Sequence, residues 1–177
     1  MVELNYMLTE NQEEYLKTIP ESKNTEIKPW DPKTKEVAHR LIDAIKNADP
    51  ELGIIYTGAS ALGISGVNDL DFTVTCPIED FSKHLPNLVK ILGDPQKIGK
   101  ENVRWEGIQK EGFIVDVHMT DPNSPSLKEH IRLFELLKNN QELLDEYEML
   151  KVKSNGVSYR EYQCRKYEFY NKVLGIN

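Results

Sequence analysis

Two aspartates, Asp69 and Asp71, lie in "NDLDFTV", at the entrance of a segment that reads as a strand. In an extended chain residues i and i+2 project from the same face, so the two carboxylates point the same way. They repel each other, and in a partly dry site one of them would bind a proton unless a cation were present. Mg²⁺ would remove this conflict, because it prefers oxygen ligands and is held by one or two carboxylates together with substrate phosphates.

A third aspartate, Asp116, lies in "FIVDVHM" among apolar neighbours. An acid inside such a strand is costly unless it is paired or bound to a metal. If this strand lies beside the strand at 70–76, Asp116 joins Asp69 and Asp71. Three such carboxylates suit nucleotidyl transfer, in which two position the metal and triphosphate while the third shares a second metal and helps to deprotonate a hydroxyl. Taken alone, the Asp69–Asp71 pair has an equally good structural interpretation, since Asn68-Asp69 can cap a turn.

Small residues precede the acidic pair in "YTGASALGISG". Gly58 permits a close turn at the end of a strand. Ser60 falls where a helix would begin, so its hydroxyl and nearby N–H groups are candidates for holding an anionic ligand. His118, two residues after Asp116, shares the face of that residue. It is expected either to line the pocket or to be a hydrogen-bonded core histidine.

The elements that must position these residues follow from the periodicity of the apolar side chains. A leading helix begins after Asp31-Pro32, strands occupy "GIIYTG" and "LDFTVTC", and "NVRWEGIQKEGFIVDVHMT" reads as a hairpin. The segment "IEDFSKHLPNLVKILG" looks helical with Pro86 as a candidate break, and the pattern is helical from Ser126 onward. This layout predicts an α+β fold in which helices flank a small mixed β-sheet, with a helical C-terminal third. Residues 1–25 are predicted to be an extension that docks on a single domain formed by residues 26–177.

Composition limits the kinds of molecule that this protein is expected to bind and where it is expected to be found. The net charge of −7 argues against a polynucleotide, because affinity for nucleic acid comes largely from basic residues that neutralise phosphates. A small phosphorylated ligand is compatible with it, since a divalent cation can bridge the like charges. No run of eighteen apolar residues and no signal-like start are present, so neither a membrane span nor secretion is expected. The two cysteines, Cys76 and Cys164, are far apart and indicate reduced thiols in the cytoplasm.

The segment "GASALGISGVNDLDFTV" resembles the glycine-serine and DxD signature of the nucleotidyltransferase superfamily, which has the DNA polymerase beta-like fold. More specifically, the chain resembles the uncharacterised GrpB family, whose members share that fold, over roughly residues 26 to 175. Four small residues fit the strand–loop segment of that family loosely, and an aspartate falls on its aspartate: Gly58, Ser60, Ala61, Gly63 and Asp71. "VDVHM" with its proline-containing loop is also similar, as are two Tyr-x-x-x-Lys pairs in the following helices: Tyr147 with Lys151, and Tyr162 with Lys166.

Two departures from the family pattern matter. Ala59 stands where the signature serine often follows glycine, which would shift the phosphate contact to Ser60. In the other direction, Asp69 and Asp116 are both present, so this chain resembles a complete three-carboxylate nucleotidyltransferase site.

The residues and the resemblance together predict a nucleotidyltransferase-like enzyme that uses Mg²⁺, with Mn²⁺ as the alternative ion, and a nucleoside triphosphate such as ATP. Its implied metal-binding and catalytic residues are Asp69, Asp71 and Asp116. Its implied nucleotide-binding residues are Gly58, Ser60, His118, Lys151 and Lys166. The acceptor is expected to be a hydroxyl of a small molecule or a protein. Two alternatives stay open: a non-catalytic nucleotide-binding or regulatory module, which Ala59 supports, and a metal-dependent phosphohydrolase.

Overall fold

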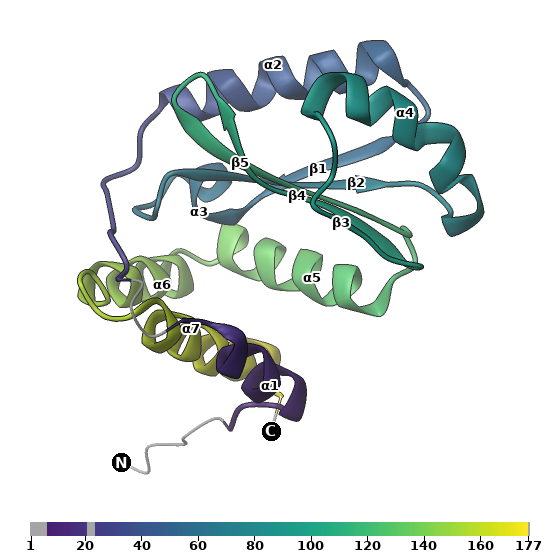
Figure 1. Ribbon diagram of the computed structural model, residues 1–177. Coiled ribbons are helices and arrows are strands. Elements are labelled where there is room, and N and C mark those ends of the chain that lie inside the picture. The colour runs from purple at the N-terminus through teal and green to yellow at the C-terminus, as the bar shows by residue number, and fades with distance from the viewer. Residues whose placement is uncertain (1–6, 21–23, 177) are drawn as a thin grey trace. The chain divides into compact units, whose positions relative to one another are not determined.

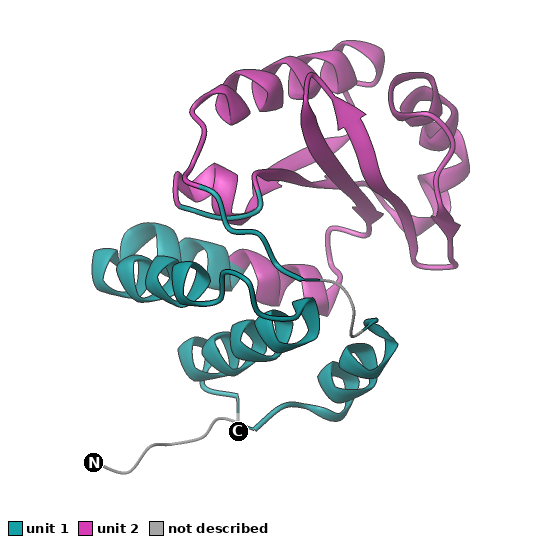
Figure 2. Cartoon of the chain, turned by 60° about the vertical axis from the view of Figure 1, so that its left-hand side comes forward, with its two compact units in different colours: residues 1–28, 65–67, 132–177 teal, residues 29–64, 68–131 magenta. Residues whose placement is uncertain are grey.

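The computed structural model describes residues 7–20 and 24–176, which divide into two compact units (Figure 2). The sheet unit consists of residues 29–64 and 68–131. The helical unit consists of the described residues within 1–28, 65–67 and 132–177. Each unit is described by itself below.

All residues of the sheet unit are described, and they form a five-stranded mixed sheet in the order β1-β2-β5-β4-β3 (Figure 1). Its strands, in chain order, are β1 (Gly53–Thr57), β2 (Asp69–Thr75), β3 (Lys97–Ile98), β4 (Asn102–Lys110) and β5 (Phe113–Thr120). β2 and β5 pair in parallel, and the other neighbouring strands pair antiparallel. The two strands that carry the three aspartates are therefore hydrogen-bonded neighbours.

One face of this sheet packs against α2 (Lys33–Ala48) and α4 (Phe81–Leu92), the second of which follows a short 3₁₀ turn at Ile78–Asp80 (Figure 1). The core between them is formed by apolar side chains of both helices and of alternate strand residues, among them Ile45, Leu88, Leu70, Phe72, Val74, Trp105, Val115, Val117 and Met119. Because neighbouring strand residues point to opposite faces, the residues between these apolar ones point away from the core. The other face of the sheet is therefore free to carry polar side chains.

The helical unit contains α1 (Glu10–Thr18), α6 (Gln141–Lys153) and α7 (Tyr159–Leu174), while α5 (Pro125–Asn139) crosses the division between the units. The N-terminal segment docks on α7: the side-chain amide of Gln12 donates to Asn171 Oδ1 at 3.0 Å, and Arg160 donates to the Ile19 carbonyl at 2.6 Å. Of the predicted extension at residues 1–25, residues 1–6 and 21–23 lie outside the described residues. Whether residues 26–177 act as a single domain stays a prediction.

The predicted leading helix, the first two strands, the hairpin and the C-terminal helices are all present. The expected break at Pro86 is wrong, since α4 continues through this residue. A proline inside a helix removes one hydrogen bond, and the burial of Leu88 and Leu92 after it offsets that cost. Within the described chain, no helix combines the length and the apolar character needed to cross a membrane.

A buried polar network joins the end of α2 to α4. Asp49, which follows the last residue of α2, accepts hydrogen bonds from Asn87 Nδ2 at 3.0 Å and shares one with His84 Nδ1 at 2.7 Å. Asp49 and His84 are 5% and 3% exposed, so neither side chain has bulk water as an alternative partner. The network therefore fixes the loop that leads into β1.

Acid should weaken the sheet unit through Asp49. Burial alone would raise the pKa of this carboxyl, but hydrogen bonds from Asn87 and His84 outweigh burial and lower the pKa. Stability from such a carboxyl is present above about pH 4 and is lost as the pH falls through the lowered folded value. We expect Asp49→Asn to cost about 2 kcal/mol near neutral pH, and this cost to shrink in acid.

Urea unfolding between about pH 7 and pH 2 would measure that difference. Replacement of the exposed Asp43 by asparagine is the matched control, because it removes one carboxylate from α2 itself. A cost of Asp49→Asn that stays the same at every pH would contradict the expectation.

Candidate metal and nucleotide site

The three predicted acids come together on the face of the sheet that points away from the α2–α4 core. The parallel register of β2 and β5 places Asp71 directly beside Asp116, and Asp69 lies two residues earlier on the same face of β2. One carboxylate oxygen from each residue lies within 4.8 Å of the other two. All three side chains are partly buried. The arrangement concentrates three acidic groups in a space that one cation could fill.

Gly58 lies against this group. β1 ends at Thr57, and α3 (Gly58–Leu62) begins at Gly58 with a φ of +80°. A Cβ atom at this position would lie 2.1 Å from Asp71 Oδ2, which is closer than two such atoms can approach. Glycine is therefore required here both for the backbone conformation and for the close approach of the chain to Asp71.

Ser60 lies in the middle of α3 with 1% of its surface exposed. Its hydroxyl donates a hydrogen bond to the main-chain carbonyl of Asp69 at 2.6 Å, and the indole N–H of Trp30 donates to the Ser60 carbonyl at 3.1 Å. The serine therefore fixes α3 to the start of β2. The contact with phosphate that the sequence suggested for its hydroxyl stays a prediction.

A β-bulge in β4 lies opposite Asp116. The main-chain N–H of Gly107, in the bulge, donates to Asp116 Oδ1 at 2.6 Å. Gly107 is a neighbour of the site that the sequence did not predict. A single glycine inside a strand pattern often marks a bulge, so "RWEGIQ" carried a usable signal.

His118 follows Asp116 on the same face and is flanked by Thr73 and Arg104 on the neighbouring strands. Burial, and then the charges of Arg104 and His130, hold the pKa of His118 below its usual value. Its Nε2 atom is buried and has no hydrogen-bond partner among the described residues. This geometry does not favour the alternative of a hydrogen-bonded core histidine, and nucleotide contact remains the prediction for it.

Lys151 and Lys166 belong to the helical unit, where they lie among tyrosines of α6 and α7. Lys151 is 4% exposed, donates to Tyr162 Oη at 2.7 Å, and has its Nζ 4.7 Å from the centre of the Tyr147 ring. The Nζ of Lys166 lies 5.3 Å from the centre of the Tyr162 ring. Both amino groups are thus held by aromatic rings, which attract cations through their negative faces. Their contact with a nucleotide stays a prediction.

A second group of ionisable side chains is formed by Asp49, Glu51 and His84, whose candidate ligand atoms also lie within 4.8 Å of one another. Here the donors already have partners: Asp49 is engaged by His84 and Asn87, and Glu51 forms an ion pair with Lys83. Because each of these carboxylates already has a hydrogen-bond or ion-pair partner, the group is better explained as the structural network described above.

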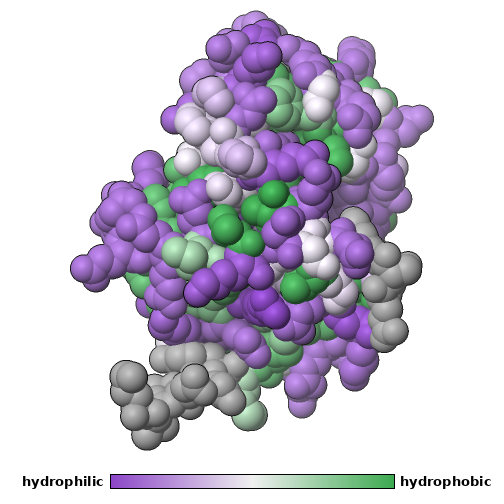
Figure 3. All heavy atoms as spheres, turned by 90° about the vertical axis from the view of Figure 1, so that its left-hand side faces the viewer, coloured by the Kyte–Doolittle hydropathy of each residue, from purple (hydrophilic) through white to green (hydrophobic). Residues whose placement is uncertain are grey.

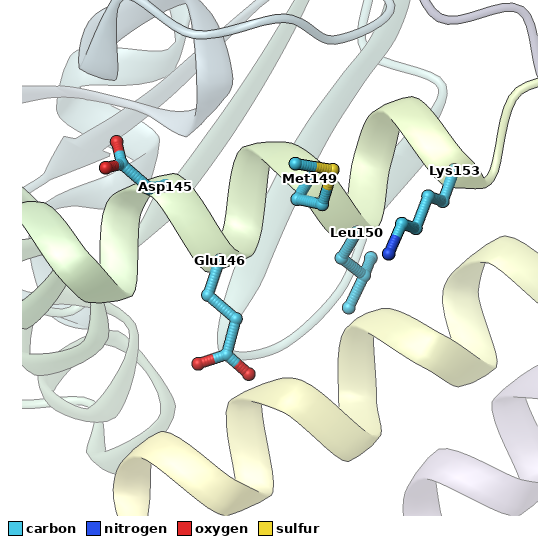
Figure 4. A pocket seen from close by; sticks show the side chains of 5 residues that line it. All are labelled: Asp145, Glu146, Met149, Leu150 and Lys153. Carbon is cyan, nitrogen blue, oxygen red and sulfur yellow. The ribbon is translucent and has the colours of Figure 1, made fainter.

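The helical unit also has an open hollow of about 490 Å³ along α6 (Figure 4). It is lined by Asp145, Glu146, Met149, Leu150 and Lys153, none of which was predicted as a site residue. Met149 is 53% exposed. On the side of the molecule shown in Figure 3 hydrophilic residues predominate and apolar ones form only small groups. The charged rim and the open shape indicate no particular ligand for this hollow.

Taken together, the fold and the geometry define the class: an α+β protein with a small mixed sheet flanked by helices, a helical C-terminal third, and an acidic group beside a glycine turn. No protein-family model and no curated protein sequence matches the chain. The crystal structure of the conserved protein GrpB from Enterococcus faecalis is similar, with a TM-score of 0.65 and 16% identity over 84% of this chain and 94% of that one. This similarity confirms the predicted α+β fold and shows that the chain shares the fold of that GrpB protein.

A weaker similarity links the chain to the Cid1 poly(U) polymerase in a structure with MgGTP bound. The TM-score is 0.41 at 18% identity, over 72% of this chain and 43% of that one. A second structure of Cid1, described as an RNA terminal uridylyl transferase, gives a TM-score of 0.42 at 16% identity. Nothing about the chemistry of this chain follows from these values.

Proposed function

We propose that this chain is a Mg²⁺-dependent nucleotidyltransferase that transfers a nucleotidyl group from a nucleoside triphosphate to a hydroxyl acceptor. The observation that carries the proposal is the group of three carboxylates on β2 and β5, within 4.8 Å of one another and beside the glycine turn that opens α3. This group forms only because two adjacent strands and one close turn bring the acids together, whereas a cluster of acids on a surface needs no such arrangement.

The donor set of Asp69, Asp71 and Asp116 fits a hard divalent cation. All three donors are oxygens, which suits Mg²⁺ and Mn²⁺. Three like charges at this spacing repel, and a cation would turn that repulsion into attraction. When bound, the ion would supply the positive charge that lets an acidic site accept a triphosphate. This chain carries a net charge of −7, so such bridging would be needed.

The residues then take distinct roles. Asp69, Asp71 and Asp116 would hold the metal. Asp116 accepts the proton of the acceptor hydroxyl, whose oxygen forms a bond to the α-phosphorus while the bond to pyrophosphate breaks, and pyrophosphate leaves. Gly58 gives the phosphates close access to the main chain. His118, which lies on the same face two residues after Asp116, is proposed as a further nucleotide contact.

The acceptor is proposed to be a small molecule or a protein, because the acidic charge of the chain disfavours a polynucleotide. A cytoplasmic location is proposed from the two separate thiols of Cys76 and Cys164, both of which are free.

Removal of the proposed base tests this function. We expect Asp116→Asn to lower the rate of pyrophosphate release by at least ~100-fold, the lower end of what general-base catalysis contributes. Nucleoside triphosphates with Mg²⁺ would be screened against panels of hydroxyl compounds and proteins, and pyrophosphate would be measured. Release that needs no acceptor and yields phosphate would indicate a phosphohydrolase instead. An unchanged rate of pyrophosphate release in Asp116→Asn would contradict the role of this residue.

One observation favours a non-catalytic nucleotide-binding module as the second candidate. Ala59 offers no hydroxyl and that of Ser60 is used on the Asp69 carbonyl, so α3 presents no serine side chain to a phosphate. Under this alternative, Mg²⁺ with a triphosphate would raise the melting temperature while no acceptor supports pyrophosphate release.

A further inference from the structure

The β4 strand carries one residue more than its partner at the level of Asp116. Trp105 pairs with Val117 and Ile108 pairs with Val115, so Glu106 and Gly107 together face the single residue Asp116. Such a bulge bends the strand and leaves main-chain groups unpaired in the ladder. The bulge therefore occurs at the one position of β5 that carries an acid of the proposed metal site.

Both main-chain N–H groups of the bulge bind side chains. The N–H of Glu106 donates to Gln96 Oε1 at 2.8 Å, and that of Gly107 donates to Asp116 Oδ1 at 2.6 Å. In a regular antiparallel ladder, main-chain N–H groups that point across the strand pair are taken by carbonyls of the partner strand. The extra residue thus provides a fixed N–H donor for a carboxylate on the neighbouring strand.

Hydrogen bonds on both sides of β4 fix the position of the bulge. Trp105, the residue just before it, is 0% exposed and donates its indole N–H to the Gly93 carbonyl at 2.8 Å. On the outer side, the N–H of Gln96 donates to the Arg104 carbonyl at 3.0 Å, which places the Gln96 side chain beside Glu106. With the strand fixed at these points, the Gly107 N–H has a defined direction.

We propose that the Glu106–Gly107 bulge is a positioning element for Asp116. The Gly107 N–H holds Oδ1, which sets the rotation of the carboxylate and so directs Oδ2 toward Asp69 and Asp71. This inference rests on the proposed function, because it assigns Gly107 to the same metal site. Gly107 touches neither metal nor substrate in this scheme and acts only through Asp116.

Glycine is needed at this position because of its backbone conformation. Gly107 has a φ of +70°, a region that residues with a Cβ rarely adopt, although an added Cβ would meet no atom within 4 Å. An alanine here would relax toward a negative φ and turn its N–H away from Asp116. Gly112, in the turn of the same hairpin, has a φ of +87° and equally open space, so it provides a matched control.

The test compares Gly107→Ala with Gly112→Ala in the full chain. Urea unfolding would measure stability, and titration with Mn²⁺ followed by electron paramagnetic resonance would measure metal affinity. We expect both variants to lose similar stability, and only Gly107→Ala to bind Mn²⁺ about tenfold more weakly, the size of effect seen when a group that orients a metal ligand is removed. Equal Mn²⁺ affinity in the two variants would overturn the inference.

A spectroscopic measurement without metal separates this inference from the proposed function. The amide proton of Gly107 should resonate downfield because its donor–acceptor distance to a carboxylate is short. It should move upfield in Asp116→Asn, while the Gly112 amide stays in place. An unmoved Gly107 resonance would overturn the inference even if Mn²⁺ binds. Failure of the wild-type protein to bind Mn²⁺ would overturn the proposed function, and the metal role of Gly107 with it.

Discussion

Replacement of Asp71 by asparagine should abolish the stabilisation of this protein by Mg²⁺ or Mn²⁺. Asp71 is the central acid of the group, since it lies beside Asp116 in the register and two residues from Asp69. We expect metal affinity to fall by at least ~100-fold, because even the groups that orient metal ligands contribute about 10–100-fold. Thermal unfolding with and without the ion, and calorimetric titration, would measure the loss.

The same substitution should leave the metal-free protein as stable as the wild type or more stable. Asparagine has nearly the shape of aspartate but removes one of three mutually repelling charges. This opposite sign separates loss of a ligand from general damage to the fold. Asp43→Asn serves as the control, because Asp43 is exposed on α2 and the substitution changes the net charge equally. Metal affinity of Asp71→Asn within a factor of about two of the wild type would rule out the carboxylate group as the metal site, given the effect expected for a ligand.

Substitution of Gly58 by alanine should weaken metal binding by displacing the Asp71 carboxylate. The new Cβ would lie 2.1 Å from Asp71 Oδ2, so the Asp71 carboxylate must rotate away from the other two acids. The φ of +80° adds a backbone cost of about 1 kcal/mol for a residue with a Cβ. We expect lower stability together with a fall in metal affinity of at least about tenfold.

Gly63→Ala is the matched control for this effect. Gly63 ends the same short helix with a φ of +75°, and an added Cβ would meet only Trp30 at an ordinary distance of 4.0 Å. It should therefore share the backbone cost and retain metal affinity. If calorimetry showed equal affinities for the two variants, the close approach of Gly58 to Asp71 would have no part in metal binding.

The part of this site that the sequence predicted depends on local pattern. Alternation along "LDFTVTC" assigns Asp71 to the polar face of its strand, with Asp69 two residues earlier on the same face. The adjacency of the strand that carries Asp116 was only a condition in the sequence, and the register of β2 and β5 meets it. The turn at Gly58 was also predictable from local pattern, because small residues directly after a strand favour a close turn.

The features that escaped prediction depend on contacts between distant segments. The direction of the Ser60 hydroxyl is set by the Asp69 carbonyl, and the partner of Gly107 is a side chain on another strand. The burial of His84 follows from its pairing with Asp49, which lies 35 positions earlier in the sequence. None of these contacts produces a periodic pattern of residue types, so a single sequence does not reveal them. The helix break predicted at Pro86 is wrong for a related reason, since packing of α4 on the core offsets the local preference of proline against a helix interior.

Crystals of the protein grown with Mn²⁺ and a non-hydrolysable nucleoside triphosphate analogue would test the metal site directly. An anomalous difference map would show where the ion lies. We expect a peak about 2.0–2.3 Å from carboxylate oxygens of Asp69, Asp71 and Asp116, with the phosphates of the analogue completing the coordination. A peak at Asp49, Glu51 and His84 instead, or no peak at the three aspartates at saturating Mn²⁺, would contradict the proposed metal and nucleotide site.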